Sequence, residues 1–373
     1  MIEIREVKTK RDIKQFIEFP INLYKGNQYF VPPLYSDELA LFKKDYHYYE
    51  QSEAVYYNAY IDNKIVGRIC GILQNASNTK WNQKRVRFNR FDCIDNQEVA
   101  DALFKKVEEW AKEKGMEEVV GPLGFSDLER EGLLIEGFDE LSTFEEQYNY
   151  QYYQKLIENN GYTKEVDWVE RQLRAPKEVD PRLERISSMM MKKYNLHYGN
   201  AKNINDFIKK YADGFFDILD QTYDHIYGTV PITKKMRKNL IKSFKLIVKT
   251  EFVGVILDEN NRIVCFGLVF PSLSKALVGT NGKLTPRTLI KLLKAIKKPD
   301  SLDFGLIGVL PEYAMKGVAS ALINRTMKLL TSGKYLYAET NLMLEDNKNI
   351  QNQWKLFDTR LHKKRRSFVK KIK

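Results

Sequence analysis

The stretch Ile307-Gly-Val-Leu-Pro-Glu-Tyr-Ala-Met-Lys-Gly-Val-Ala-Ser-Ala-Leu322 joins a predicted strand to a predicted helix through a glycine-containing loop. Such a junction directs several unpaired backbone N–H groups and the positive end of the helix dipole toward one point. Lys316 adds a positive charge, Gly317 permits a positive φ and the close approach of a phosphate, and Ala319 and Ser320 keep the first helical turn small. The segment predicts an anion site, and an ordinary strand-to-helix turn is the alternative.

Both halves of the chain show the same order of elements around such a strand and helix. Each half contains a β-hairpin pattern in which an Asp/Asn turn joins two β-rich runs, at 57–71 and at 253–267. A strand, a helix and a strand follow, at 86–93, 97–114 and 118–121 and again at 302–309, 318–330 and 335–338. Each half closes with a helical pattern and a last strand, at 152–158 with 166–173 and at 349–360 with 366–371. A repeat of about half the chain is the economical interpretation.

Length and composition exclude several classes of protein. A chain of 373 residues with 43% hydrophobic and 12% aromatic residues supports two packed domains and excludes a small stapled fold or wholesale disorder. No apolar run reaches membrane-spanning length, and the first residues are charged, so we expect a cytoplasmic protein without integral membrane association. Three distant cysteines and four scattered histidines show no metal-ligand spacing, so we expect no metal.

The net charge of +12 is distributed unevenly along the chain. Residues 1–180 carry 25 Lys and Arg against 33 Asp and Glu, whereas the remaining residues carry 36 against 16. Three stretches without acids, at 232–250, 272–299 and 363–373, each contain seven Lys or Arg. Any one of them is more typical of a solvated face, but together they favour an anionic ligand or partner for the second half.

The segment Val309–Leu322 resembles the acyl-CoA-binding motif of the GCN5-related N-acetyltransferase superfamily, whose core is Gln/Arg-x-x-Gly-x-Gly/Ala. Ala314, Gly317 and Ala319 occupy its three marked positions. The resemblance covers the second half from about Glu251, and its order of elements also fits the first half to about Arg174. It implies an α/β fold of two tandem acetyltransferase-like domains, each a mixed central sheet flanked by helices. It also implies acetyl-CoA or another acyl-CoA as a substrate.

The resemblance implies a set of acyl-CoA-binding residues in the second half. The preceding strand, with Ile307 and Val309, resembles the strand whose splayed end pairs with the pantetheine arm. The phosphate loop corresponds to residues 316–320, namely Lys316, Gly317, Val318, Ala319 and Ser320. Asn347 resembles the asparagine that begins the helix on the other side of the cofactor.

Two departures from the family pattern bear on affinity and catalysis. Ala314 stands where a Gln or Arg is usual, which leaves Lys316 as the nearest charged replacement. The family's tyrosine acid, seven residues beyond the asparagine, corresponds to Trp354, which cannot protonate a thiolate. The acid must come from elsewhere, or water supplies the proton, or catalysis is absent. Glu339, just past a predicted strand, is our candidate base, and a surface strand end is its alternative.

The first half has no phosphate loop, because acids follow its corresponding strand. We predict domains at 1–174, without the phosphate loop, and at 190–373, with the acyl-CoA motif, joined by a linker and connecting helix at 175–189. The run at 121–139 resembles a signature of bacterial tandem acetyltransferase-like proteins that carries no assigned substrate.

An acid-rich loop in the first half is the candidate acceptor site. From Asp127 to Glu146 there are eight acids and one base, which would attract a cationic amine, and a solvated loop is the alternative. Asp127, Glu131 and Tyr148 are the candidate substrate-binding residues. Tyr148 belongs to a tyrosine cluster that is more often packing than chemistry.

Residues 285–298 read TPRTLIKLLKAIKK and predict an amphipathic helix that Thr285 caps and Pro299 ends. We expect this helix to cover a sheet or the domain junction, and a membrane-surface helix is the alternative.

These observations predict an acyl-CoA-dependent N-acyltransferase that acts on a small amine or peptide in the cleft between the two domains. One alternative is a non-catalytic protein whose basic half binds nucleic acid or anionic lipid, with a vestigial acyl-CoA site. Another is an aminoacyl-tRNA-dependent transferase, although the chain lacks the long charged coiled-coil arm that such enzymes often insert. We do not favour nucleic acid as the partner.

Overall fold

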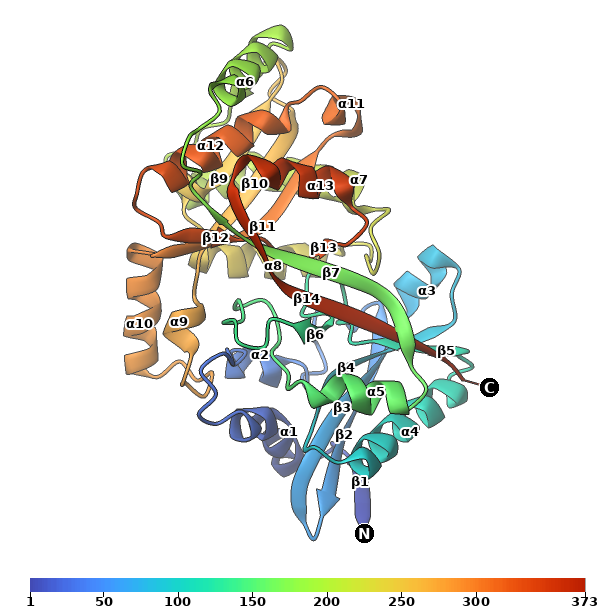
Figure 1. Ribbon diagram of the computed structural model, residues 1–373. Coiled ribbons are helices and arrows are strands. Elements are labelled where there is room, and N and C mark those ends of the chain that lie inside the picture. Colours follow the sequence, from blue (N-terminus) through green and yellow to red (C-terminus); the bar gives the residue numbers. More distant parts are fainter. Residues whose placement is uncertain (373) are drawn as a thin grey trace. The chain divides into compact units, whose positions relative to one another are not determined.

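The computed structural model describes residues 1–372 and divides into two compact units (Figure 1). Unit 1 comprises residues 1–169, 273–292 and the C-terminal residues from Lys363, and unit 2 comprises residues 170–272 and 293–362. Each unit is a mixed α/β structure, which confirms the predicted fold class. The predicted domains, at 1–174 and 190–373, describe the two halves of the sequence repeat and stay a prediction.

Unit 1 is built on a mixed sheet with the strand order β1-β2-β3-β4-β5-β14, and β6 also pairs with β14. Its strands are β1 (Ile2–Glu6), β2 (Ser52–Ile61), β3 (Lys64–Gln74), β4 (Arg85–Cys93), β5 (Glu118–Gly121), β6 (Leu133–Glu136) and the last part of β14 (Asp358–Lys371). Its helices are α1 (Lys10–Leu23), α2 (Tyr35–Ala40), α3 (Asn75–Trp81), α4 (Gln97–Glu113), α5 (Tyr152–Asn159), α9 (Ser274–Leu277) and α10 (Pro286–Lys297), whose last residues the unit boundary assigns to unit 2.

Local sequence explains why the main elements of unit 1 form. Asp62 and Asn63 adopt positive φ angles of 48° and 62° in the two-residue turn between β2 and β3, as the hairpin pattern predicts. The Asn96 side chain accepts a hydrogen bond from the Val99 amide, and this contact caps α4. Neighbouring residues of β3 face opposite sides of the sheet: Gly67 faces α4, whereas Arg68 lies over the Phe16 ring of α1.

Unit 2 repeats this plan with the strand order β7-β12-β11-β10-β9-β8, and β13 also pairs with β7. Its strands are the last part of β7 (Thr163–Arg174), β8 (His197–Tyr198), β9 (Val253–Leu257), β10 (Ile263–Pro271), β11 (Ser301–Val309), β12 (Tyr337–Glu339) and β13 (Met343–Leu344). Its helices are α6 (Pro181–Lys193), α7 (Ile204–Tyr223), α8 (Lys234–Ile247), η1 (Thr250–Phe252), α11 (Pro311–Ala314), α12 (Ala319–Thr331), α13 (Lys348–Gln353) and η2 (Trp354–Leu356).

Helices cover both faces of the unit 2 sheet. Gly254 and Gly267 face Leu322 of α12, whereas Phe266 packs its ring at 4.3 Å from Phe215 of α7. The expected helix at 349–360 ends earlier than predicted: α13 stops at Gln353, η2 follows, and β14 begins at Asp358. Strand pairing of β14 overrides the helical pattern there.

The last strand of each half of the chain pairs with a strand from the other half. In β7, Gln172 and Leu173 pair with Glu339 and Ala338 of β12. In β14, residues 368–371 pair with residues 118–121 of β5. The order along the chain predicts that each half closes its own sheet, so this expectation is wrong. Either pairing satisfies the same backbone groups, and local sequence carries no signal that selects between them.

In the part of the chain that the structure describes, no helix combines the length and apolarity needed to cross a membrane. Within residues 1–372 there is also no cluster of three or more His, Cys, Asp or Glu side chains arranged to hold a metal ion.

Candidate functional site

The two parallel strands β11 and β12 of unit 2 pair only over their first three residues. Ser301 pairs with Tyr337, Leu302 with Ala338, and Asp303 with Glu339, and no pairing follows beyond this point. The register between β11 and β10 also shifts between Gly267 and Val269, so β11 carries a bulge after Phe304. One edge of β11 from Phe304 to Val309 is therefore released from the sheet, as the resemblance implies for this strand.

A tyrosine hydroxyl occupies the released edge at Ile307. The Tyr223 hydroxyl, at the end of α7, donates a hydrogen bond to the Ile307 carbonyl oxygen at 3.0 Å, and the Ile307 amide donates back to the same hydroxyl at 3.3 Å. Both backbone groups of Ile307 therefore point away from β10, toward the space that β12 leaves. Val309 lies further along the same strand.

The loop after β11 presents backbone amides that have no protein acceptor. Among residues 1–372, the amides of Gly317, Val318 and Ala319 donate to no protein atom, and α12 begins at Ala319 without a side-chain cap. Gly317 has φ +70°, and a Cβ added there would meet its nearest neighbour, Met190 Cγ, at 3.7 Å. These amides converge at a helix start, which is the geometry of an anion site.

The two polar side chains of this loop are placed differently. Lys316 Nζ lies 4.9 Å from the Tyr194 ring centroid and 4.6 Å from that of Tyr313, so two aromatic faces hold the cation beside the loop. Ser320 Oγ is buried without a hydrogen-bond partner in the described structure. A buried hydroxyl without a partner is costly unless a ligand completes it.

Four buried polar side chains gather where β11 and β12 diverge. Asp303, Glu339 and Gln172 are each 7% exposed and lie side by side on β11, β12 and β7. Directly paired residues point to the same face, so these three face the side on which Phe270, the partner of Asp303, stacks on Phe244 of α8.

His362 of β14 orients the Glu339 carboxylate. Its Nε2 lies 3.1 Å from Glu339 Oε2, and its Nδ1 lies 3.0 Å from the Glu170 carbonyl oxygen. Because a carbonyl oxygen can only accept, Nδ1 carries a proton, which leaves Nε2 to exchange a proton with Glu339. The imidazole side chain is fully buried, so its orientation is fixed by these two contacts.

Sequence reasoning identified Glu339 but not Asp303 and His362 beside it, nor Tyr223 at Ile307. Asp303 lies within the predicted strand at 302–309, and no motif of the sequence points to it. His362 and Tyr223 are separated from Glu339 and Ile307 by 23 and 84 residues, and no spacing rule connects them. Only the tertiary structure brings them to this end of the unit 2 sheet.

Asn347 lies outside this group of contacts. Its Oδ1 accepts a hydrogen bond from the Ile350 amide at 3.3 Å and caps α13. No hydrogen bond or ion pair of the described residues joins Asn347 to the loop at 316–320. Trp354 is buried, with its indole nitrogen 3.0 Å from Met343 Sδ, and so offers no proton to this site.

The predicted acceptor residues lie in unit 1 and are only partly brought together. Burial raises the pKa of Glu131 well above its usual value, and the nearby charges of Asp127 and Glu146 raise it further. Glu131 is buried and Asp127 is partly exposed, so Asp127 is the more accessible acid of the pair. Tyr148 is 6% exposed and donates to the Phe138 carbonyl oxygen at 3.0 Å, so it belongs to the aromatic core.

Unit 1 contains the same divergence of strands, but its own residues fill it. The strands β4 and β5 pair only over Arg85–Arg87 and Glu118–Val120. Beyond them the Leu123 amide donates to the Phe88 carbonyl oxygen at 2.9 Å, and the Asn89 side chain donates to the Arg130 carbonyl oxygen at 3.1 Å. The released edge is thus closed by the loop that follows β5.

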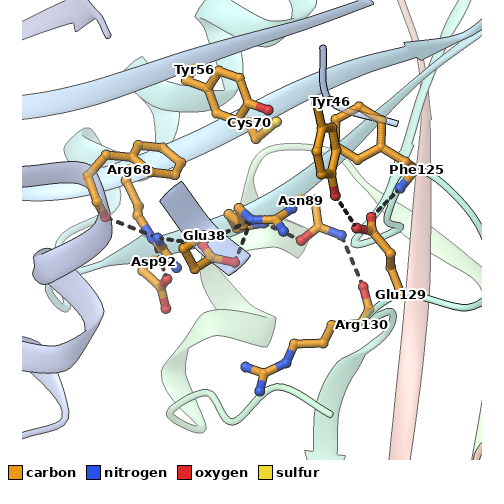
Figure 2. Close-up of polar contacts among 12 residues, drawn as sticks. Glu38, Tyr46, Tyr56, Arg68, Cys70, Asn89, Asp92, Phe125, Glu129 and Arg130 are labelled. Atoms are coloured by element: carbon orange, nitrogen blue, oxygen red, sulfur yellow. Dashed lines mark hydrogen bonds and ion pairs between the residues drawn. The ribbon is translucent and has the colours of Figure 1, made fainter. Parts of the chain in front are cut away.

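A buried ion cluster lies beside this closed edge, and we define it as Glu38, Arg68, Arg90 and Asp92. Figure 2 shows Glu38, Arg68 and Asp92 of this cluster together with Asn89 and Arg130. Arg90 Nε donates to both Glu38 oxygens at 3.2 and 3.1 Å, and Arg68 Nε lies 2.9 Å from Asp92 Oδ2. Arg90 has a positive φ of 49°, which is rare for a residue other than glycine.

The buried ion cluster is internally satisfied. The Tyr24 hydroxyl donates to Asp92 at 2.9 Å, and Arg68 also donates to the Phe16 carbonyl oxygen. Burial raises the pKa of the neighbouring Cys70 thiol to about 12, so this cysteine is no nucleophile at neutral pH. Because its charges are paired and the neighbouring thiol is protonated, we interpret this cluster as structural. The released edge of β11 in unit 2 is therefore the better candidate for a functional site.

Comparisons with known proteins agree with this architecture. No model of a known protein family matches the chain. The chain is 25% identical over 383 residues to "Protein YghO" of Escherichia coli K12, an alignment that covers 99% of this chain and 95% of that protein. It is 26% identical over 302 residues to "Bacterial ceramide synthase" of Caulobacter vibrioides, covering 79% of this chain and 77% of that protein.

Solved structures identify the fold. A tandem GNAT protein from the clavulanic acid biosynthesis pathway matches with a TM-score of 0.56 and 9% identity, over 100% of this chain and 99% of that one. A GCN5-related glucosamine N-acetyltransferase region of a fungal β-N-acetylglucosaminidase matches with a TM-score of 0.58 and 11% identity, over 99% of this chain and 38% of that one. The chain therefore has the tandem GCN5-related N-acetyltransferase fold that its sequence predicts.

Proposed function

We propose that this protein is an acyl-CoA-dependent N-acyltransferase whose site lies in unit 2. The observation that carries the proposal is the released edge of β11, with an open amide loop at one end and a buried carboxylate at the other. Unit 1 has the same strand divergence, but its edge is closed. Only unit 2 offers backbone groups to a ligand along this edge.

The residues of the loop suit the phosphates of acyl-CoA. We assign the pyrophosphate to the amides of Gly317, Val318 and Ala319, with Ser320 Oγ as a further partner. Lys316 lies beside this loop and contributes positive charge. The backbone groups of β11 at Val309, and those of Ile307 once the Tyr223 hydroxyl moves aside, suit the amides of the pantetheine arm, and Asn347 stays a predicted polar contact of that arm.

We assign the chemical step to the buried polar side chains where β11 and β12 diverge. Glu339, oriented by His362, takes a proton from the acceptor ammonium, directly or through water. The neutral amine then attacks the thioester carbonyl. The Ile307 amide, which donates to the Tyr223 hydroxyl in this structure, would turn to the oxygen on which negative charge develops. The carbon–nitrogen bond forms, the carbon–sulfur bond breaks, and the thiolate leaves.

Tyr223 fills the role of acid that Trp354 cannot. Its hydroxyl already lies at Ile307, where the thioester carbonyl would be held, and it can protonate the departing thiolate. We expect Tyr223→Phe to lower kcat about 10²-fold or more while acyl-CoA affinity changes little, since a positioned general acid typically contributes about 10²- to 10⁴-fold. A series of thioesters tests the role: the loss should shrink as the leaving thiol becomes more acidic. An equal loss across the series would show that Tyr223 only shapes the β11 edge.

Lys316 is expected to act by charge. Lys316→Ala should weaken CoA binding several-fold more than it weakens pantetheine, because pantetheine lacks the phosphates. Lys328→Ala, an exposed lysine of the same unit that pairs with Glu184, serves as the control. Isothermal titration calorimetry with both ligands measures the difference. If the two ligands lose equal affinity, Lys316 contributes only packing between Tyr194 and Tyr313.

The acceptor class follows from the chemistry and from one relative. A ceramide is a long-chain amino alcohol acylated on nitrogen, so the relative named bacterial ceramide synthase is named for an N-acylation. We therefore propose two acceptor classes to be tested together, namely small amines or basic peptides and long-chain amino alcohols. Each is to be offered with acetyl-CoA and with a long-chain acyl-CoA.

The test of the function has two stages. Calorimetry with acetyl-CoA, long-chain acyl-CoA and CoA first asks whether unit 2 binds the nucleotide. Mass spectrometry of the acceptor panel then asks whether an N-acylated product forms. Binding without any product would favour the non-catalytic alternative. Binding of aminoacyl-tRNA without acyl-CoA binding would favour the tRNA-dependent alternative, and neither outcome is compatible with the proposal.

A further inference from the structure

The helix α10 carries an exposed apolar stripe. Leu289, Ile290 and Leu293 are 46%, 55% and 56% exposed, and Leu284 in the preceding loop is 52% exposed. Positions 289, 290 and 293 are neighbours on one side of a helix because they are spaced by one, three and four residues. Four of the chain's large exposed apolar side chains thus fall within ten residues, which marks a surface rather than scattered exposure.

A basic stripe borders the apolar one. Arg287, Lys291, Lys294 and Lys298 follow the next side of the helix at spacings of three and four residues, and all four are exposed. None of them forms an ion pair with an acid of residues 1–372, and no acid occurs anywhere between Ser272 and Pro299. The positive charge of this side is therefore available to an external anionic surface.

Only the remaining side of α10 packs on the protein. Thr288 and Leu292 are buried, and their spacing of four residues places them together on one side of the helix. The helix start is fixed, because the Thr285 hydroxyl accepts from the Thr288 amide at 3.2 Å. The loop before it is anchored in unit 1, where the Tyr35 amide donates to the Gly282 carbonyl oxygen at 2.9 Å. An anchored, amphipathic helix therefore projects its apolar and basic sides outward.

We propose that α10 binds the surface of an anionic lipid bilayer, with Leu289, Ile290 and Leu293 inserted among the acyl chains and the basic stripe on the headgroups. Apolar and basic stripes side by side, without a spanning helix, are the features of a helix that lies in the membrane interface. The sequence favoured a helix that covers a sheet or the domain junction, and in α10 the buried residues are Thr288 and Leu292. The proposal does not depend on the proposed catalytic function.

The experiment is co-sedimentation of the full chain with lipid vesicles. We expect binding to vesicles of equal parts phosphatidylglycerol and phosphatidylcholine, and little binding to phosphatidylcholine alone. Substitution of Leu289, Ile290 and Leu293 by serine should lower vesicle partitioning at least about tenfold. Lys291→Glu with Lys294→Glu should lower it about fivefold or more for each lysine and reduce its sensitivity to salt.

A matched triple variant supplies the control. Leu246, Met315 and Leu336 are 73%, 95% and 65% exposed and lie on other elements, so their replacement by serine removes as much exposed apolar surface elsewhere. This variant should bind vesicles as the unaltered protein does. Equal losses in both triple variants, or no binding of the unaltered protein to anionic vesicles, would overturn the proposal. Light scattering measures the oligomeric state of the same variants. If loss of the α10 stripe converts a dimer into a monomer and leaves vesicle binding unchanged, the stripe is a protein interface and the proposal is overturned.

Discussion

Replacing Glu339 by glutamine is expected to lower kcat for acyl transfer by about 10²- to 10⁴-fold, the usual contribution of a positioned general base. Glutamine keeps the size of the side chain and its place on β12 but cannot accept the ammonium proton. Steady-state kinetics with the best acceptor of the panel measures the effect. Acyl-CoA affinity should stay within about twofold, because Glu339 lies at the opposite end of the released edge from the phosphate loop.

Two neighbouring variants separate the role of Glu339 from that of its surroundings. Asp303→Asn removes the adjacent buried carboxylate, and we expect a smaller loss because His362 contacts Glu339, our candidate base. His362→Gln should also lower kcat, since it removes the imidazole contact that orients the Glu339 carboxylate. A full rate in Glu339→Gln, or a greater loss in Asp303→Asn, would move the base to Asp303.

Replacing Gly317 by valine is expected to abolish measurable CoA binding, a loss of about 100-fold or more. Gly317 has φ +70°, and a β-branched residue in that region costs roughly 1–2 kcal/mol and shifts the loop. The added side chain would also stand among the three amides that we assign to the pyrophosphate. Calorimetry with CoA measures the loss, and circular dichroism follows the fold.

Gly333 provides a matched control for this variant. It also has φ +70°, lies just past the end of α12, and has no atom within 4 Å of an added Cβ. Gly333→Val therefore imposes the same backbone strain without approaching the loop. We expect it to lose some stability and to keep its CoA affinity. If Gly317→Val binds CoA as Gly333→Val does, the phosphates lie elsewhere.

Much of the fold could be predicted because its signals are local. The Asp/Asn turn of the first hairpin, the Asn96 cap of α4 and the strand-to-helix junction after β11 each depend on a few adjacent residues. Apolar periodicity then placed Val99, Leu103 and Val107 on the buried side of α4, where all three are fully buried. Short-range geometry of this kind depends on adjacent residues, so it can be predicted from the sequence.

The candidate site was predictable only in part. The loop with Gly317 and the position of Glu339 follow from a motif and a strand end, so the sequence sufficed for them. Tyr223 and His362 could not be found, because their partners are distant in the chain and their residue types are common in cores. Two residues that the sequence proposed for the site have structural contacts instead. Asn347 caps α13, and the Tyr148 hydroxyl donates to the Phe138 carbonyl oxygen in the core.

The sequence by itself determined the repeat, the glycine-containing strand-to-helix loop of the second half and the concentration of basic residues there, since each is a property of neighbouring residues. Only the tertiary structure decided that β7 and β14 exchange sheets, because backbone pairing is alike for either partner. It also decided which strand divergence stays open. In unit 1 the loop after β5 satisfies the free edge, whereas in unit 2 the Tyr223 hydroxyl contacts it at Ile307. That outcome depends on how distant segments pack, which no local pattern encodes.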